Sequence, residues 1–283
     1  MGYKVAAPMS IALPDRRTLR DACTVLARDA AREIMRIYAG DLGERTKADK
    51  SPVTDADHAA EDIIVRGLRA LTPGMPVVAE EEMAAGRVPQ LNGGPFWLVD
   101  PLDGTKEFIK RNGEFTVNIA LIESGKPTLG IVLAPVPDTL WRGDAELGAD
   151  KSEKAGAFTP IAVRAPPAAG LTAFASRSTA IYSDLDIWFR SNDLTVAERK
   201  QAGSSLKFCL LAAGEADLYP RPSPTNEWDT AAGHAVLVAA GGRVFAPDGS
   251  PLLYRKPRFF NPGFVGTGTY DPPPIGPFMQ GLT

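Results

Sequence analysis

The sequence has very little of the chemistry that depends on thiols or imidazoles. Among 283 residues there are two cysteines and two histidines. Neither Cys23 nor Cys209 belongs to a CxxC pair or a zinc-binding spacing, and each falls in an apolar helical pattern typical of a buried thiol. A cysteine-phosphatase site is excluded, because Asp29 stands where such a site after Cys23 needs an arginine. His58 and His234 also lie in helical patterns, and we expect them to support neighbouring residues rather than act as bases.

Long hydrophobic runs and a strong charge of one sign are missing too. No apolar stretch reaches the roughly 18 residues needed to span a bilayer, and the first residues make a poor signal peptide. The net charge of -3 does not suit a protein built to hold a nucleic acid polymer or an anionic membrane. With so few cysteines, we expect a cytoplasmic protein, with peripheral attachment to the inner face of a membrane as the alternative. The sequence carries no signal for an oligomeric state.

The hydrophobic content of 44% suffices for a large core, and its periodicity changes along the chain. Apolar residues at steps of three and four predict helices over 15–39 and 55–70, with Thr54 as the N-cap of the second. Apolar runs between turn signals predict strands, and the second half alternates strands with helices, as in layered α/β folds. The expected strands are 76–79, 96–99, 116–122, 129–134, 172–176, 216–219 and 243–246, and the expected later helices are 179–190, 206–213 and 227–240.

The segment 143–170 carries charge, glycine and proline with little periodicity, which predicts a boundary between two lobes. We therefore expect one domain over residues 15–270, with lobes of about 15–145 and 160–270. Residues 1–14 are expected to be a loose extension, and residues 271–283 a loose proline-rich tail.

Two acids follow an apolar strand in the stretch DPLDGT. The proline between them fixes a turn, so the side chains of Asp100 and Asp103 can converge with the Leu102 carbonyl between them. Gly104 lets the backbone approach a ligand, and a helix starting at Thr105 would direct free N–H groups toward an anion. The stretch predicts oxygen ligands for a hard cation beside a phosphate cradle, with a plain surface turn as the alternative.

Three other acids stand where predicted elements begin or end. Glu80 is the first residue after a strand, Asp57 follows a helix N-cap by three residues, and Asp229 opens the last long helix. Helix capping explains Asp57 and Asp229 equally well, and a cap can also be a ligand. If these acids converge with Asp100 and Asp103, each like-charged pair at about 4 Å costs roughly 4 kcal/mol at an effective dielectric near 20. Such a cluster needs cations, and its hard oxygens select Mg²⁺ or Mn²⁺ and hence phosphoryl chemistry.

These blocks carry a family resemblance. The EE pair at 80–81, DPLDGT at 100–105 and WDTAAG at 228–233 resemble the inositol monophosphatase superfamily of lithium-sensitive, magnesium-dependent phosphatases. One branch, the bacterial CysQ-type 3′(2′),5′-bisphosphate nucleotidases, is similar in further blocks, namely KADKSPVT, KEFIKRNGEFTVNIAL, GSSLKFC, LYPR and FNPGF. The resemblance covers about residues 17–265 and implies an α-β-α-β-α sandwich like that of inositol monophosphatase and fructose-1,6-bisphosphatase, with the site between two lobes.

The resemblance also implies a reaction, in which adenosine 3′,5′-bisphosphate gives AMP and phosphate during sulfate assimilation. 3′-Phosphoadenylyl sulfate is a second substrate to expect. Asp57 and Thr105, with Glu80, would activate the attacking water. The enzyme would use two or three Mg²⁺ ions, with Mn²⁺ as a substitute, and Li⁺ would inhibit it. The implied metal ligands are Glu80, Asp100, the Leu102 carbonyl, Asp103 and Asp229. The implied substrate contacts are Leu102, Asp103, Gly104, Thr105, Asp229, Glu80, Ser205 and Lys207.

Three alternatives compete with this function. A haloacid-dehalogenase phosphatase needs a nucleophilic Asp two residues before a second Asp, and Pro101 stands two residues before Asp103. The second alternative keeps the fold but takes inositol phosphates, fructose bisphosphate or other sugar phosphates. The third is a non-enzymatic metal- or polyanion-binding protein on the same scaffold. The candidate receivers of a second phosphate, each with a solvated surface charge as its alternative, are Lys106, Lys110, Arg111, Lys207 and Arg221, of which Lys207 stands out in an apolar helix.

Overall fold

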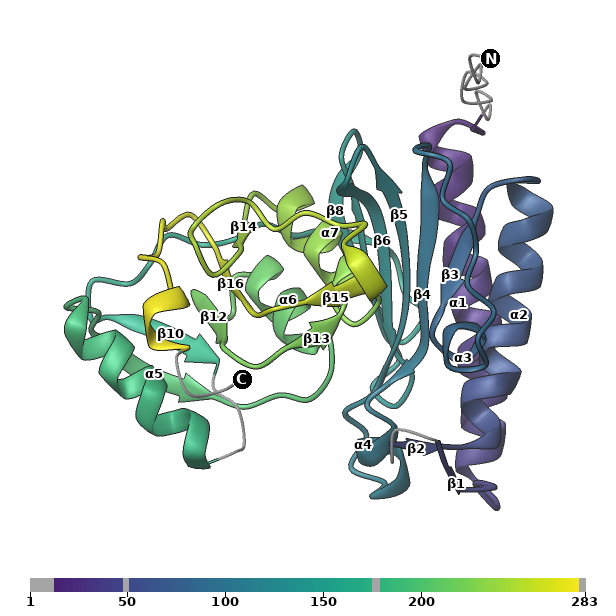
Figure 1. Ribbon diagram of the computed structural model, residues 1–283, viewed down its shortest axis with the longest axis horizontal. Coiled ribbons are helices and arrows are strands. Elements are labelled where there is room, and N and C mark those ends of the chain that lie inside the picture. The colour runs from purple at the N-terminus through teal and green to yellow at the C-terminus, as the bar shows by residue number, and fades with distance from the viewer. Residues whose placement is uncertain (1–12, 48–50, 175–178, 280–283) are drawn as a thin grey trace, which may run out of the picture.

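Two antiparallel helices cover the outer face of the first lobe in the computed structural model, which describes residues 13–47, 51–174 and 179–279 (Figure 1). Helix α1 spans Arg16–Tyr38 and α2 spans Asp55–Leu71, as predicted. The Asp15 side chain caps α1 by accepting from Thr18 N at 3.0 Å. Thr54 caps α2 in a capping box whose other member is Asp57. The sequence signals that start these helices are therefore the contacts that the structure uses.

A seven-stranded sheet lies behind these helices, in the order β3-β4-β5-β6-β7-β8-β9. Its strands are β3 (Val77–Ala79), β4 (Phe96–Asp103), β5 (Thr116–Glu123), β6 (Lys126–Ala134), β7 (Thr139–Asp144), β8 (Gly148–Glu153) and β9 (Thr159–Pro160). All pair antiparallel except β3 with β4. The first lobe extends beyond its expected end near residue 145, because β8 and β9 still belong to this sheet. The connection to the second lobe, 161–170, lies inside the predicted boundary segment 143–170. Strands β8 and β9 lack an apolar pattern in the sequence, because several of their side chains are exposed to solvent.

The second lobe has a five-stranded sheet in the order β11-β10-β12-β16-β14. Its strands are β10 (Leu171–Phe174), β11 (Val196–Lys200), β12 (Leu218–Arg221), β14 (Arg243–Phe245) and β16 (Phe264–Thr267), and its helices are α5 (Thr179–Ser191), α6 (Leu206–Ala212) and α7 (Ala231–Ala239). The predicted strand 172–176 is confirmed through Phe174, and its last two residues lie outside the described ones. Short ribbons are formed by β1 (Arg45–Thr46) with β2 (Pro52–Val53) and by β13 (Thr225–Asn226) with β15 (Phe260–Asn261).

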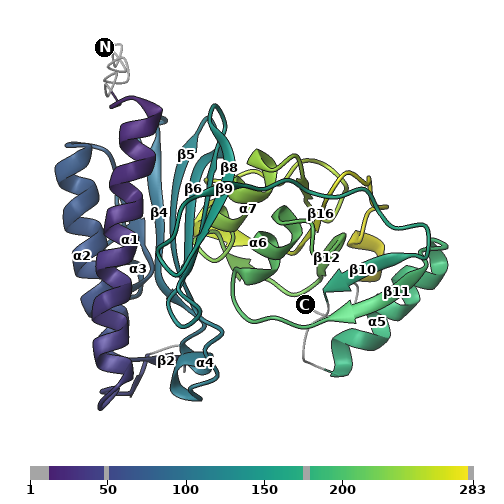
Figure 2. The same cartoon turned by 180° about the vertical axis from the view of Figure 1, so that it is seen from behind.

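Helices α6 and α7 lie between the two sheets, and α5 covers the outer face of the smaller one (Figures 1 and 2). The layers are thus α1/α2, sheet, α6/α7, sheet and α5, which confirms the predicted α-β-α-β-α sandwich. Two glycines let α7 lie directly on the large sheet. A Cβ on Gly130 would lie 2.2 Å from Ala232 O, and one on Gly143 would lie 2.4 Å from Val236 Cα. Any larger residue there would push α7, and the loop before it, away from the sheet.

Two further expectations differ from the structure. The last long helix begins at Ala231 rather than at residue 227, so Asp229 lies in the loop before it. The tail is packed rather than loose through residue 279: Ile275 is 1% exposed, and Trp188 Nε1 of α5 donates to Pro274 O at 3.3 Å. Residues 1–12 and 280–283 lie outside the described part of the chain. Within the described part, no helix is both long enough and apolar enough to cross a bilayer.

Candidate active site

Strand β4 carries both acids of the DPLDGT stretch. The predicted strand 96–99 is longer in the structure and continues to Asp103 through a bulge. Asp100 pairs with Asn118 and Asp103 pairs with Thr116, so β4 has one residue more than β5 between these two pairs. The Asp100 carboxylate closes the bulge by accepting from Leu102 N at 3.0 Å. The extra residue re-aims the side chains that follow it, so a bulge rather than a terminating turn directs the two acids.

Gly104 follows the bulge and starts the short helix α4 (Thr105–Ile109). Its φ of 100° lies in the left-handed region, and an added Cβ would lie 3.1 Å from Glu114 O. Helix α4 then places Thr105 Oγ1 at 3.1 Å from Asp57 Oδ1. The other Asp57 oxygen accepts from Thr54 N and Thr54 Oγ1, both at 2.7 Å. The structure thus brings together the pair predicted to activate water, although 48 residues separate them in sequence.

Glu80 and Glu81 open helix α3 (Glu80–Ala84), and the side chains of both pair with the ammonium group of Lys47. Lys47 Nζ donates to Glu80 Oε1 at 2.7 Å and to Glu81 Oε1 at 2.5 Å. Burial raises the pKa of Glu81 to about 7. Sequence reasoning placed Lys47 in a motif but gave it no partner, because a contact across 33 residues leaves no local signal. The next residues of that motif, 48–50, lie outside the described ones.

Asp229 reaches the site from the second lobe. Its Oδ2 accepts from Asn226 N at 2.9 Å, a capping type of contact, although the helix starts later than expected. The Ser205 hydroxyl lies 2.7 Å from Asp229 O and 3.1 Å from Asp103 Oδ2, and it accepts from Asn118 Nδ2 at 3.0 Å. Ser205 is therefore a polar link between the two lobes. It was predicted to contact substrate, but its neighbour Ser204 lines the cavity instead.

The acids of the two lobes repel one another. Burial raises the pKa values of Asp100 and Asp229 well above the usual range, and the charges of Asp103 and Glu80 act in the same direction on both. The pKa of Asp103 is raised by burial too, against the lowering effect of Lys207. Partly dehydrated carboxylates that repel one another suit a divalent cation with hard oxygen ligands, such as Mg²⁺. As they lie, however, no three acidic, histidine or cysteine side chains of the described residues are close enough to enclose an ion.

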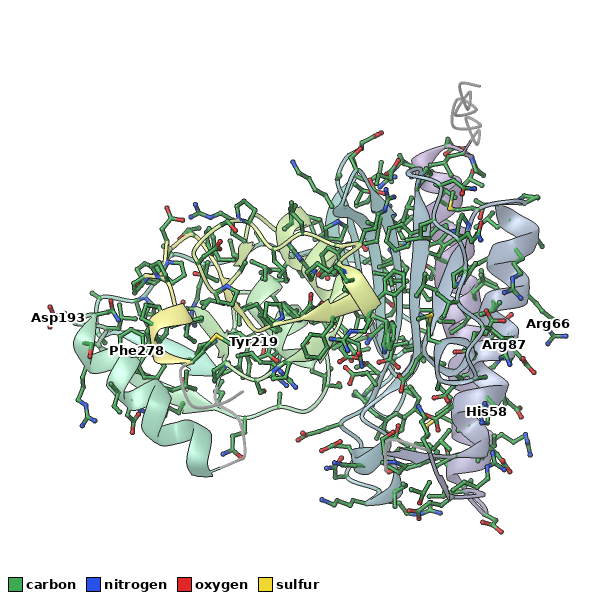
Figure 3. The ribbon with its side chains drawn as sticks, in the orientation of Figure 1. His58, Arg66, Arg87, Asp193, Tyr219 and Phe278 are labelled. Carbon is green, nitrogen blue, oxygen red and sulfur yellow. The ribbon has the colours of Figure 1, made fainter. Side chains whose placement is uncertain are left out.

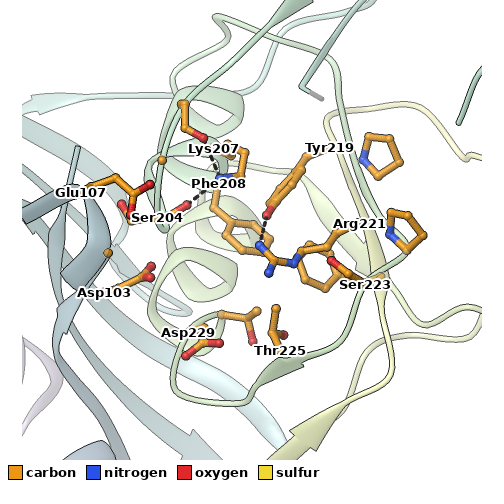
Figure 4. Close-up of a pocket in the computed structure, with 17 residues that line it drawn as sticks. Asp103, Glu107, Ser204, Lys207, Phe208, Tyr219, Arg221, Ser223, Thr225 and Asp229 are labelled. Carbon is orange, nitrogen blue, oxygen red and sulfur yellow. Dashed lines mark hydrogen bonds between the residues drawn. The ribbon is translucent and has the colours of Figure 1, made fainter. Parts of the chain in front are cut away.

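A cavity of about 310 Å³ adjoins these acids (Figure 4). Asp103 and Asp229 form one wall, and Lys207 and Arg221 stand opposite. Lys207 is 7% exposed and uses two of its donors on Ala202 O and Ser204 O, at 2.8 and 3.0 Å. Arg221 Nη1 donates to Tyr219 Oη at 3.4 Å, and its buried Nε has no partner among the described residues. The cavity thus joins an acidic end to a cationic end.

Three other predicted phosphate receivers do not line the cavity. Lys106 is exposed on α4, and Lys110 is exposed directly after the end of this helix. Arg111 donates to the carbonyls of Tyr38 and Gly40 and so closes the end of α1. Of the five cations considered, Lys207 and Arg221 remain. His234 is buried and its Nδ1 lies 2.9 Å from Tyr254 Oη, as expected of a residue that supports its neighbours. His58 is instead exposed on α2 (Figure 3), so the expectation that it supports neighbouring residues is wrong.

The chain is similar to known proteins over most of its length. Residues 15–266 match the inositol monophosphatase family. The chain is 49% identical over 249 residues to the 3′(2′),5′-bisphosphate nucleotidase CysQ of Escherichia coli K12, covering 86% of this chain and 97% of that protein. CysQ of Salmonella typhimurium is 49% identical over 84% of this chain and 95% of that protein. The crystal structure of CysQ from Bacteroides thetaiotaomicron superposes with a TM-score of 0.75 at 36% identity, covering 90% of this chain and 98% of that one.

Proposed function

The chain belongs to the inositol monophosphatase family, and we propose from this that it is a 3′(2′),5′-bisphosphate nucleotidase that removes the 3′-phosphate of adenosine 3′,5′-bisphosphate. The observation that supports a bisphosphate as the substrate is the cavity with an acidic end and a cationic end. A phosphate at the acidic end requires a bridging cation, and a second phosphate would find Lys207 and Arg221 directly. A monophosphate such as inositol 1-phosphate would leave the cationic end unmatched. The same ends would accept 3′-phosphoadenylyl sulfate, and clearance of the bisphosphate fits sulfate assimilation.

The cation is Mg²⁺ in this proposal, and the donor set suits it. Glu80, Asp100, the Leu102 carbonyl, Asp103 and Asp229 would hold two or three ions, with Mn²⁺ as a substitute and Li⁺ as an inhibitor. When bound, Mg²⁺ supplies positive charge to the phosphoryl oxygens. Gly104 and Thr105 offer backbone N–H groups to the same phosphate, at a point where the glycine leaves no side chain in the way.

The attacking water is oriented by Asp57 and Thr105. The Thr105 hydroxyl donates to Asp57 Oδ1 at 3.1 Å, so the Thr105 oxygen can accept a hydrogen bond from water. As water attacks, its proton passes to Thr105 while the Thr105 proton passes to the Asp57 carboxylate. The two contacts from Thr54 keep the Asp57 carboxylate from rotating. Water then attacks phosphorus in line with the 3′-oxygen, which leaves as an alkoxide and takes its proton from solvent. No covalent intermediate on the protein is required.

Arg221→Met tests the cationic end. Phosphate release is measured with adenosine 3′,5′-bisphosphate and with inositol 1-phosphate, each with Mg²⁺. We expect wild type to prefer the bisphosphate, and the variant to raise KM for the bisphosphate about 10- to 100-fold, because one charge-assisted contact is lost. Turnover of inositol 1-phosphate should stay unchanged. Arg243→Met is the matched control, since Arg243 is an exposed cation of the same lobe paired with Asp271.

The rival functions give different outcomes. Equal turnover of both substrates by wild type would favour the broad phosphatase of the same fold. An absence of phosphate release from either substrate with Mg²⁺ would favour the non-enzymatic binding protein.

A further inference from the structure

One buried carboxylate near the site has no role in the chemistry described above. Glu61 of α2 is 4% exposed. Its Oε2 accepts from Glu81 N at 2.7 Å, and its Oε1 accepts from Glu82 N at 2.8 Å. Both carboxylate oxygens are therefore engaged by the backbone of the acidic turn. Burying a carboxylate beside other acids is costly unless it is well hydrogen-bonded, so this placement needs a reason.

The position of Glu61 on its helix supplies that reason. Glu61 lies four residues after Asp57, so both side chains project from the same face of α2. One helix thus presents the carboxylate that orients the water and the carboxylate that holds the turn beginning at Glu80. Lys47 holds the side chains of Glu80 and Glu81, whereas Glu61 holds the backbone behind them.

We propose that Glu61 is a positioning residue: its carboxylate fixes the turn at Glu81 and Glu82 and thereby sets where Glu80 stands relative to Asp57. The role of Glu80 as a metal ligand rests on the proposed function, but the hold on the turn does not. Without the Glu61 carboxylate, two N–H groups lose their acceptor and the turn must move to find others. Groups that orient metal ligands typically change metal affinity about 10- to 100-fold when removed.

Glu61→Gln is the variant that tests this role, because it keeps the size of the side chain. Its amide has one acceptor oxygen, and its NH₂ group would face a backbone N–H. Above pH 8, where the Glu61 carboxyl is ionised because its pKa is about 8, we expect calorimetry to show Mg²⁺ binding weakened about 10- to 100-fold, and kcat to fall. KM for adenosine 3′,5′-bisphosphate at saturating Mg²⁺ should stay unchanged, because the cationic end of the cavity belongs to the other lobe. Hydrogen exchange should show faster exchange at the Glu81 and Glu82 amides.

Asp217→Asn is the matched control. Asp217 is another buried carboxylate that accepts from a backbone N–H, that of Thr172 at 2.7 Å, and it also pairs with Arg164 at 2.8 Å. It lies in the second lobe, directly before β12 and bonded to Thr172 of β10. This variant should lose thermal stability to a similar extent while keeping the Mg²⁺ affinity of wild type.

Three results would overturn the proposal. They are unchanged exchange at the two amides in Glu61→Gln, unchanged Mg²⁺ affinity with faster exchange, and an equal loss of Mg²⁺ affinity in Asp217→Asn. Failure of the proposed function looks different. In that case wild type itself would bind no Mg²⁺ and release no phosphate, while the exchange at Glu81 and Glu82 would still report whether Glu61 holds the turn.

Discussion

Two groups of buried acids in this molecule have opposite surroundings. Asp217 and Glu227 have partners for their oxygens: Asp217 accepts from Thr172 N and Arg164, and Glu227 accepts from two backbone N–H groups and Lys256 at 2.7 to 2.9 Å. Asp100 and Asp229 each accept a hydrogen bond from only one backbone N–H. Burial is the main cause of their raised pKa values, and the charges of neighbouring carboxylates raise these pKa values further. The first group stabilises the folded protein through its hydrogen bonds and ion pairs, whereas repulsion within the second group destabilises it. Unrelieved repulsion in a well-packed protein indicates that a ligand, here a cation, completes the site.

Removing Asp103, whose charge acts on both Asp100 and Asp229, and removing Asp217 should break this comparison in opposite directions. Asp103→Asn should lower turnover by at least about a thousandfold, because the variant loses a proposed ligand of the Mg²⁺ that would stabilise charge on the phosphoryl group. In EDTA the same variant should melt a few degrees higher, because one repelling charge is gone. Asp217→Asn should do the reverse and melt lower, with turnover per folded molecule close to wild type. Phosphate release and thermal melting, run on both variants, give the answer; retained activity in Asp103→Asn would count against the site.

The pH dependence of stability should sharpen the comparison. Burial, together with the charges of neighbouring carboxylates, raises the pKa of Glu61 to about 8 and that of Glu81 to about 7. Between pH 6.5 and 8 the folded protein therefore binds protons that the unfolded chain has already released, so the unfolding free energy in EDTA should fall as pH rises. The slope should reach on the order of 1 kcal/mol per pH unit. Urea titrations at several pH values measure it.

Saturating Mg²⁺ should reduce that slope, because a cation favours the charged form of each carboxylate. A slope that is flat in EDTA, or that Mg²⁺ leaves unchanged, would mean that the acids are not coupled to the cation.

The smallest effect is expected below pH 6.5, at a buried group outside the acid cluster. Burial lowers the pKa of His234 to about 3, and its Nδ1 lies 2.9 Å from Tyr254 Oη. Between pH 6.5 and 3 the unfolded chain binds a proton that folded His234 does not, so stability should fall as pH drops through this window. His234→Gln should remove about 1–3 kcal/mol of that loss near pH 5, measured by urea unfolding. His58→Gln is the control, because His58 is exposed on α2 rather than buried. An equal effect of both variants would contradict this assignment.

Much of the site was predictable where chemistry and local geometry coincide. The capping box placed Asp57 at the start of α2, and Gly104 placed the start of α4, because both depend on residues within one turn. The bulge in β4 was predicted as a turn, since one extra residue is visible only against the partner strand. Lys47, Ser204 and the hold of Glu61 on the acidic turn were missed, because their partners lie far away in sequence.

Local sequence determined which elements form and which side chains are chemically able to act, because apolar period, caps and turn residues operate over a few positions. Tertiary structure alone decided which of these side chains meet. Ser205 joins Asp103 to Asp229 across the lobes, and Lys207 and Arg221 line the same cavity as those acids. The close approach of α7 to the large sheet at Gly130 and Gly143 is part of the packing that brings the lobes together. Contacts between distant segments follow from packing, which depends on the shape of the whole core rather than on any single stretch of chain.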